Sequence, residues 1–298
     1  MSARGWVCRH VFTTELDAVV TASGEALERH PEVEFFFIRH WNGGPHVRLR
    51  LRGRDHRAPG AEALRSVERA LRDVLRSAPA SPWPSPDAYA RRTRPLGEAE
   101  GVPESEIKTL RRPNTCEPAE YTAETDKYGT GEVLDRCEAY FCRQSAMIAR
   151  ELRTRRDAPD GWRFAAALHL VTALLEVGRA PGADGRPAAE AAAPPRLGRD
   201  WNPLQADAAG RIAADVATAI SVRRWGRRIG PRLAEDLVSL VREIGQDTPR
   251  RCGPHLVHTS INRLGIVPEQ ERRLWRLARS ARDRRPSPAG RDIEGQGP

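Results

Sequence analysis

The chain has 298 residues, with 49 lysines and arginines against 40 acidic residues and a formal net charge of +9. Hydrophobic residues make up 39%, which is enough for one sizeable core. No run approaches the ~20 apolar residues that span a bilayer, which argues against a membrane protein. The segment Met1 to His10 lacks the apolar region of a signal peptide, so we expect a cytoplasmic protein. The basic excess fits either arginine-rich codon usage or attraction of an acidic partner.

The sequence predicts neither a metal site nor a disulfide framework. Five cysteines are scattered along the chain without a Cys-x-x-Cys pair. Glu, His and Cys nowhere show the spacing of metal ligands, so we expect no metal and no cofactor.

The first ~55 residues predict strands around a helix. Gly5 to Phe12 is short and favours a strand, and the next apolar positions, from Leu16 to Leu27, follow a helical period. The aromatic run 33–41 predicts a second strand, Asn42 to Pro45 a turn, and His46 to Arg52 a third strand that alternates basic and apolar residues. The last two strands should form a hairpin.

The remainder is predominantly helical. Helices are expected at Ala61–Arg76, Glu132–Leu152, Phe164–Val177, Asp207–Ile220, Pro231–Ile244 and Pro268–Ala281. Between them lie an extended, irregular stretch (Ile107–Tyr121), a low-complexity loop (Ala180–Leu197) and a lead-in to the last helix (Cys252–Leu264). We expect one α+β domain over residues 1–281, in which N-terminal strands with a basic hairpin pack with a mostly helical remainder, followed by a disordered tail over 282–298.

The basic strand is the first candidate site. His46, Arg48, Arg50 and Arg52 project to one face, because side chains alternate along a strand. A row of guanidinium groups can clamp carboxylates or phosphates. An ordinary solvated strand face explains the same pattern, and both interpretations stay open.

Two further segments carry candidate chemistry. In the first, Tyr121, Lys127 and Tyr128 sit beside a glycine-rich turn ahead of the long helix, where backbone N–H groups can bind an anion. In the second, His258 is followed by Asn262 and Arg263, a spacing that could orient an acid or base and hold an anion. A helix cap and a structural histidine are the plain alternatives.

The order of these motifs resembles one family. Successive pieces are an aromatic strand ending in Arg39-His40-Trp41, then Gly-Gly-Pro-His-Val-Arg-Leu-Arg, Tyr-x-x-Glu-x-x-Lys-Tyr-Gly, Glu138-x-x-Phe141-x-x-x-Ser145 and His-x-x-x-Asn-Arg-Leu-Gly. Together they resemble the lantibiotic-dehydratase C-terminal family, also called the thiopeptide-type bacteriocin biosynthesis domain, from about Trp6 to Leu277. The chain departs from the family at Gly129-Thr130-Gly131, where a Gly-Gly pair is usual, and at Lys127, where many members carry Arg.

The resemblance implies an enzyme that modifies a ribosomally made precursor peptide, in a free-standing form. One activity of such forms is elimination of glutamate from glutamylated Ser or Thr, giving dehydroalanine or dehydrobutyrine, after a separate glutamylation protein has acted. The other is formation of the thiopeptide pyridine ring by formal [4+2] cycloaddition of two dehydroalanines, with loss of the leader peptide. Elimination, a lyase-type reaction, is the function we expect.

The resemblance also suggests residue roles. His258 is the candidate acid or base, with Arg48, Arg50 and Lys127 as a glutamyl clamp. Arg39, His46 and Arg263 would complete the anion pocket, with Tyr121 and Tyr128 as positioning groups. A non-catalytic peptide- or RNA-binding module is the third hypothesis, but no aromatic-interleaved basic motif supports direct nucleic-acid binding. The catalytic hypothesis requires the three segments to converge on one basic pocket.

Overall fold

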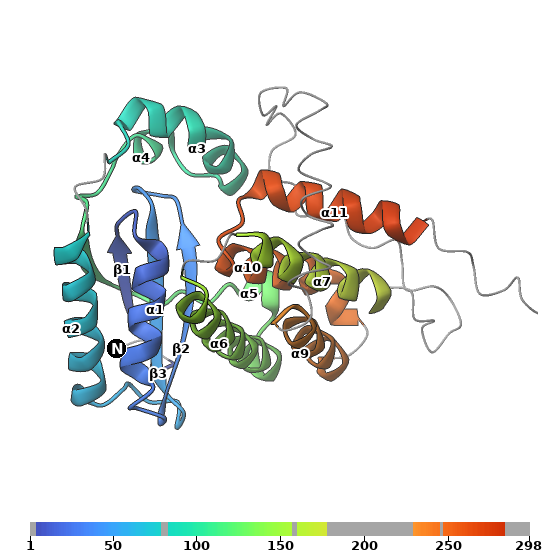
Figure 1. Cartoon of the computed structure of the whole chain (residues 1–298), viewed down its shortest axis with the longest axis horizontal. Helices are drawn as coiled ribbons and strands as arrows, with labels where there is room; N and C mark the ends of the chain where they lie inside the picture. Colours follow the sequence, from blue (N-terminus) through green and yellow to red (C-terminus); the bar gives the residue numbers. More distant parts are fainter. Residues whose placement is uncertain (1–3, 79–82, 157–159, 178–228, 245–246, 284–298) are drawn as a thin grey trace, which may run out of the picture.

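A computed structural model describes residues 4–78, 83–156, 160–177, 229–244 and 247–283 (Figure 1). The loop expected at Ala180–Leu197 and the helix expected at Asp207–Ile220 lie outside these residues, as does 284–298 of the expected tail. Of the helices that the structure describes, none combines the length and the hydropathy needed to cross a membrane.

A four-stranded antiparallel sheet forms the N-terminal part. Its strands are β1 (Val7–Phe12), β2 (Val33–His40), β3 (His46–Gly53) and β4 (Thr115–Ala119), in the order β2-β3-β1-β4. The predicted hairpin is confirmed as β2 and β3. Its turn requires Gly44, which has a φ of 112° and whose added Cβ would lie 2.5 Å from the Trp83 ring.

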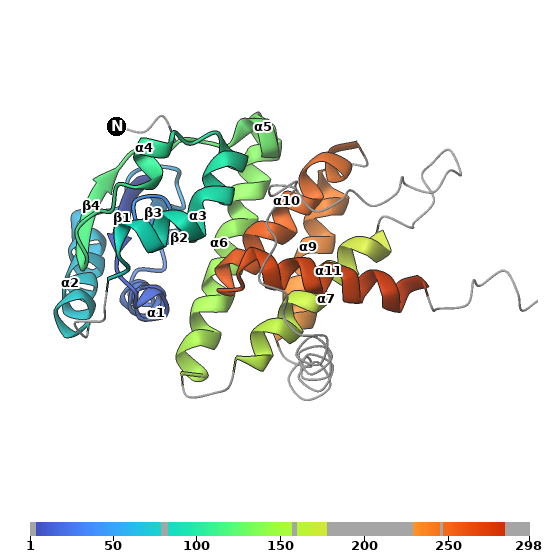
Figure 2. The same ribbon diagram turned by 90° about the horizontal axis from the view of Figure 1, so that it is seen from above.

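The two faces of this sheet differ in chemistry. The apolar positions of β3, Val47, Leu49 and Leu51, are at most 1% exposed. They lie on the side of α1 (Leu16–Leu27) and α2 (Ala61–Ser77), which run along this face (Figure 2). The basic positions of β3 therefore face the opposite side.

The second half is a helical layer beside β2. It comprises α6 (Gly131–Thr154), α7 (Gly161–Val177), α9 (Ile229–Glu243), α10 (Asp247–Arg263) and α11 (Pro268–Asp283). Helix α7 packs on α9, α10 and α11, while α6 lies against β2 and α9 (Figure 1). Together with the sheet, this layer confirms the α+β class.

Two boundaries of the helical layer differ from the expectation. The lead-in expected at Cys252–Leu264 is helical up to Arg263, where α10 ends. Gly253 lets α10 approach α7, since an added Cβ would lie 2.9 Å from Leu174. The first two residues of the expected tail are helical, because α11 continues to Asp283.

Helix α3 (Pro86–Glu100), with the short α4 (Glu104–Ile107), was not predicted. Prolines surround it and Pro95 lies inside it, so its helical pattern is weak. Pro86 opens the helix, where its missing N–H costs nothing, and Ser85 caps the Ala88 N–H. Similarly, β4 lies within the stretch expected to be irregular, and the single-turn α5 (Thr125–Tyr128) precedes α6.

A buried carboxylate joins α6 to the sheet. Glu138 is 0% exposed and accepts hydrogen bonds from Trp6 Nε1 (3.1 Å), Arg52 (3.1 Å) and the Tyr121 hydroxyl (2.5 Å), and it also pairs with Arg4. A buried charge is stable only when it is paired and hydrogen-bonded in this way.

The rest of the α6 motif faces the same strand. Ser145 accepts a hydrogen bond from the Phe37 N–H at 3.3 Å, and the Phe141 ring lies 5.6 Å from that of Phe36. Glu138, Phe141 and Ser145 recur at helical spacing, so one stripe of α6 fixes the helix against β2.

We predict that Glu138→Ala lowers the free energy of unfolding by about 3–5 kcal/mol, because it leaves Arg52 as a buried charge with only one partner. Urea-induced unfolding followed by circular dichroism measures this loss. The control is Glu132→Ala on the same helix, whose exposed side chain pairs only with Arg136. Equal stability of the two variants would contradict the structural role of Glu138.

Candidate active site

The basic row on β3 is not a solvated strand face. His46 and Arg52 are 1% and 2% exposed, and Arg48 and Arg50 are partly buried. Arg52 is neutralised by Glu34 (2.7 Å) and Glu138 (3.1 Å), so its role is structural. Arg48 and Arg50 are the cations of this strand that remain for chemistry.

Arg50 rests on aromatic rings instead of a carboxylate. Its guanidinium carbon lies 5.0 Å from the Phe36 ring and 5.4 Å from the Tyr121 ring. Cation–π contacts of this kind orient a guanidinium without neutralising its charge. Among the described residues no carboxylate forms an ion pair with Arg50, so its charge is available to a ligand.

Arg48 is oriented by a neutral histidine. The His46 Nδ1 lies 2.9 Å from the Gly44 carbonyl and must donate to it, so Nε2 can accept from Arg48 Nε at 3.4 Å. Burial and the neighbouring Arg48 and His10 lower the pKa of His46 to about 3. Burial and Arg50 lower the pKa of Arg48 to about 10, against the opposite effect of nearby carboxylates. His46 therefore positions Arg48 without adding charge.

The second candidate segment lies on α5 and just before it. Lys127 is half exposed and forms an ion pair with Glu124 at 2.7 Å. Tyr128 is buried, with its ring 5.0 Å from Phe141 and 6.4 Å from His255 on α10. Burial raises the pKa of Tyr128 above its usual value, which keeps its hydroxyl protonated. Helix α5 thus places Lys127 beside α10.

Arg263 on α10 is the most deeply buried cation of the third segment. It is 0% exposed, donates from Nε to the Phe37 carbonyl at 2.9 Å, and lies 4.6 Å from the Phe141 ring. Both terminal guanidinium nitrogens lack a hydrogen-bond partner among the described residues. Burial lowers the pKa of Arg263 to about 10. An uncompensated buried cation is costly, so an anion bound at these two nitrogens would be stabilised.

His258 forms a dyad with a buried carboxylate on α11. Its Nδ1 lies 2.7 Å from an oxygen of Glu271, whose other oxygen accepts from Trp275 Nε1 at 3.4 Å. Burial lowers the pKa of His258, but the hydrogen bond and charge of Glu271 outweigh it and raise the pKa. The sequence analysis missed Glu271, which carries no signal there beyond its place in the last helix.

Charge interactions link the three segments. We call Arg48, Arg50, Lys127, His258 and Arg263 the basic cluster. The interactions within and around it are those of Arg50 with Arg263, Glu124 with Arg48, Lys127 with His258, and Glu100 with both Arg48 and His258. In addition, α5 contacts both α6 and α10 (Figure 2). The segments therefore converge on the basic side of the sheet. Glu100 belongs to the unpredicted α3, so sequence reasoning missed it.

Arg39 does not join the basic cluster. It lies opposite Val47 in the register and thus on the other face of β2. Its guanidinium pairs with Asp17 on α1 at 2.5 Å and donates to the Arg263 carbonyl at 3.2 Å. A cation at the last carbonyls of a helix stabilises that helix end. Arg39 therefore holds α10 in place, and its predicted contact with substrate has no support in this geometry.

Metal ions have no evident site in the described part of the chain, where no group of three or more His, Cys, Asp or Glu side chains has ligating geometry. The chemistry available to the basic cluster is anion binding by guanidinium groups next to a histidine held by a carboxylate.

Comparison with known structures identifies the fold. The pyridine synthase TbtD from thiomuracin biosynthesis matches with a TM-score of 0.59 and 17% identity, covering 93% of this chain and 98% of that one. The tRNA-dependent lantibiotic dehydratase MibB from Microbispora sp. 107891 matches with a TM-score of 0.46 and 20% identity, covering 96% of this chain and 29% of that one. TsrL matches with a TM-score of 0.48 and 12% identity, covering 93% and 94%.

No curated protein matches the chain. The family model described as "Lantibiotic biosynthesis dehydratase C-term" matches residues 6–282, nearly the whole sequence. The chain is therefore a member of the lantibiotic dehydratase C-terminal family.

Proposed function

We propose that the protein eliminates glutamate from glutamylated Ser or Thr residues of a ribosomally made precursor peptide. The observation that carries this proposal is that Arg50 on β3 and Arg263 on α10 pair with no carboxylate in the described part of the chain. A glutamyl ester brings one free carboxylate into such a site and forms a second when glutamate leaves, whereas cycloaddition of two dehydroalanines brings no leaving carboxylate. The glutamylated peptide must come from a glutamyl transfer reaction, carried out by another protein or domain.

The dyad suits His258 to the role of base. Because Glu271 accepts the Nδ1 proton, Nε2 of neutral His258 is the free acceptor. In the proposed step, Nε2 takes the Cα proton of the modified residue. The electron pair of the Cα–H bond forms the Cα=Cβ double bond, and glutamate leaves with the electrons of its ester C–O bond.

The guanidinium groups have two tasks in this step. They hold the free carboxylate of the glutamyl group and the carboxylate that forms as glutamate leaves, and they stabilise the negative charge that develops on the peptide carbonyl when the Cα proton leaves. Arg48 and Arg50 suit these tasks because they are already oriented by His46 and by the two aromatic rings. Lys127 is free to exchange its partner Glu124 for a substrate carboxylate, since that pair is exposed and weak.

The proposal is tested by incubating the purified protein separately with a glutamylated peptide and with a dehydroalanine-bearing azole peptide, followed by mass spectrometry. We expect glutamate loss from the first and no change in the second.

We further expect His258→Ala to slow glutamate loss by about 100- to 10,000-fold, the usual effect of losing a positioned acid or base. Ring formation with leader loss in the second reaction would establish the cycloaddition instead, and wild-type elimination by His258→Ala would remove the histidine from the mechanism.

A second prediction concerns the pH dependence. The base must be neutral, so kcat/KM falls as pH drops through the pKa of His258, which Glu271 raises. Glu271→Gln removes that charge, so the acidic limb should move to lower pH while kcat at neutral pH decreases. Glu269→Gln, two residues earlier on α11 and on a different side of the helix, should leave the profile unchanged. An unshifted acidic limb in Glu271→Gln would show that the dyad does not tune the catalytic base.

A further inference from the structure

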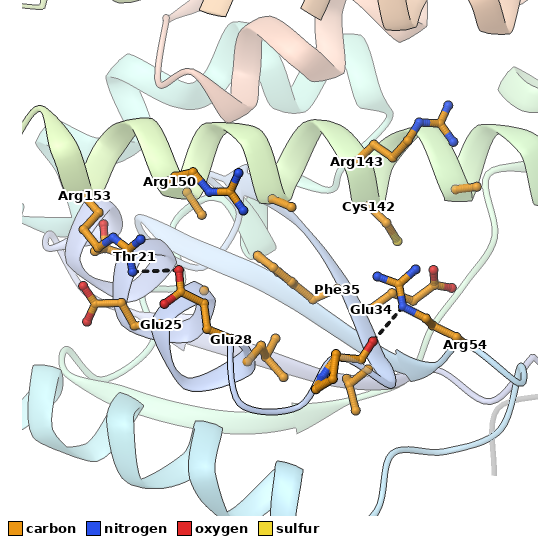
Figure 3. A pocket seen from close by; sticks show the side chains of 17 residues that line it. Thr21, Glu25, Glu28, Glu34, Phe35, Arg54, Cys142, Arg143, Arg150 and Arg153 are labelled. Carbon is orange, nitrogen blue, oxygen red and sulfur yellow. Dashed lines mark hydrogen bonds and ion pairs between the residues drawn. The ribbon is translucent and has the colours of Figure 1, made fainter. Parts of the chain in front are cut away.

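A groove separate from the basic cluster opens between α1, α6 and the start of β2 (Figure 3). It has a volume of about 500 Å³, and no member of the basic cluster lines it. Its floor is apolar, with Leu27, Val33 and Phe35 each between 5% and 7% exposed. Arginine and glutamate side chains form its rim.

The groove exposes an unpaired part of a sheet edge. Strand β2 is the outermost strand, so alternate residues direct their N–H and C=O groups away from β3. Those of Phe37 and Arg39 are taken by side chains of α6 and α10, which are Ser145, Asn262 and Arg263. Phe35 has the same parity, and its outward N–H and C=O have no partner among the described residues, whereas the Val33 N–H donates to the His30 carbonyl at 2.9 Å. An unpaired edge is a template for another extended chain.

Two arginines that form no ion pair with a described carboxylate flank this position. Arg54 lies on one side of Phe35 and Arg150 on the other (Figure 3). Arg54 donates to the Pro31 carbonyl at 2.8 Å, and no described acidic side chain forms an ion pair with either arginine. The carboxylate of Glu28 pairs with Arg153 at 2.7 Å and interacts with Arg150 only through longer-range charge attraction. The rim therefore places one arginine on each side of the Phe35 N–H and C=O groups.

We propose that this groove binds an extended acidic segment of the precursor peptide. The segment would pair its backbone with Phe35, place an apolar side chain on the floor and direct acidic side chains to Arg54 and Arg150. Side chains of an extended chain alternate in direction, which suits this division between floor and rim. The identity of the peptide rests on the proposed function, whereas the acidic, extended character of the ligand rests on the groove alone.

The test uses a fluorescein-labelled peptide of about ten residues that alternates Glu and Val, with fluorescence anisotropy at low salt as the readout. We expect binding by the wild-type protein and at least about tenfold weaker binding by the double variant Arg54→Glu/Arg150→Glu, since charge-assisted contacts of this kind contribute about that much. Arg65→Glu/Arg76→Glu, two exposed changes on α2, is the matched charge control and should bind like the wild type.

Two further comparisons separate the groove from the basic cluster. His258→Ala should bind the peptide normally, so loss of elimination and loss of groove binding can be told apart. A peptide N-methylated at alternate positions should bind more weakly, because it cannot pair with the edge of β2. The proposal is overturned if a Lys–Val peptide binds equally well, if the double variant binds like the wild type, or if N-methylation has no effect.

Discussion

The buried carboxylate of Glu138 is the constraint on which the rest of the structure depends. It joins β3 through Arg52, the segment before α5 through Tyr121, and the N-terminus through Trp6. Desolvating a carboxylate is costly, and its attraction to one arginine repays that cost only with good geometry and additional hydrogen bonds. All of these partners must therefore be in place together, which fixes α6 and the Tyr121 segment against the sheet.

The arginines on the basic side of the sheet differ in whether a described carboxylate neutralises them. Arg52 is neutralised by two carboxylates and supports the fold. Arg50 contacts Tyr121, the residue that Glu138 holds, and keeps its charge. Arg263 reaches the same region from α10 and is anchored only through Nε. The paired arginine stabilises the protein, whereas the other two, which pair with no described carboxylate, are the cations that we propose for an anion site.

The sequence contained much of this arrangement in its local periodicities. Strict alternation over 46–52 predicted both a strand and a basic face, and the helical period over 132–152 predicted α6 within two residues of each end. The prolines in α3 and in the first turns of α10 disfavour a helix locally, so the sequence did not predict these segments as helical. Packing against Trp41 and Leu174 stabilises the two helices in the folded protein.

Side-chain partners were less predictable, because they depend on contacts between distant segments. The alternation of side chains along the two strands of the hairpin would have placed Arg39 on the face opposite Arg48. Only the tertiary structure shows that Arg39 holds the end of α10. Glu271 becomes significant only because α11 returns across α10 to meet His258. The cations and the histidine that we propose for the site were thus easier to find in the sequence than the residues that position them.

The central claim is that Arg50 and Arg263, which are more than 200 positions apart in the chain, bind one carboxylate. Calorimetric titration of free glutamate into the wild type, Arg50→Ala, Arg263→Lys and the double variant tests it most directly, with unfolding curves to verify that each variant is folded. The account predicts that each single change weakens the Kd by about tenfold or more, and that the double change costs clearly less than the sum of the two. Additive losses, or an unchanged Kd in either single variant, would contradict it.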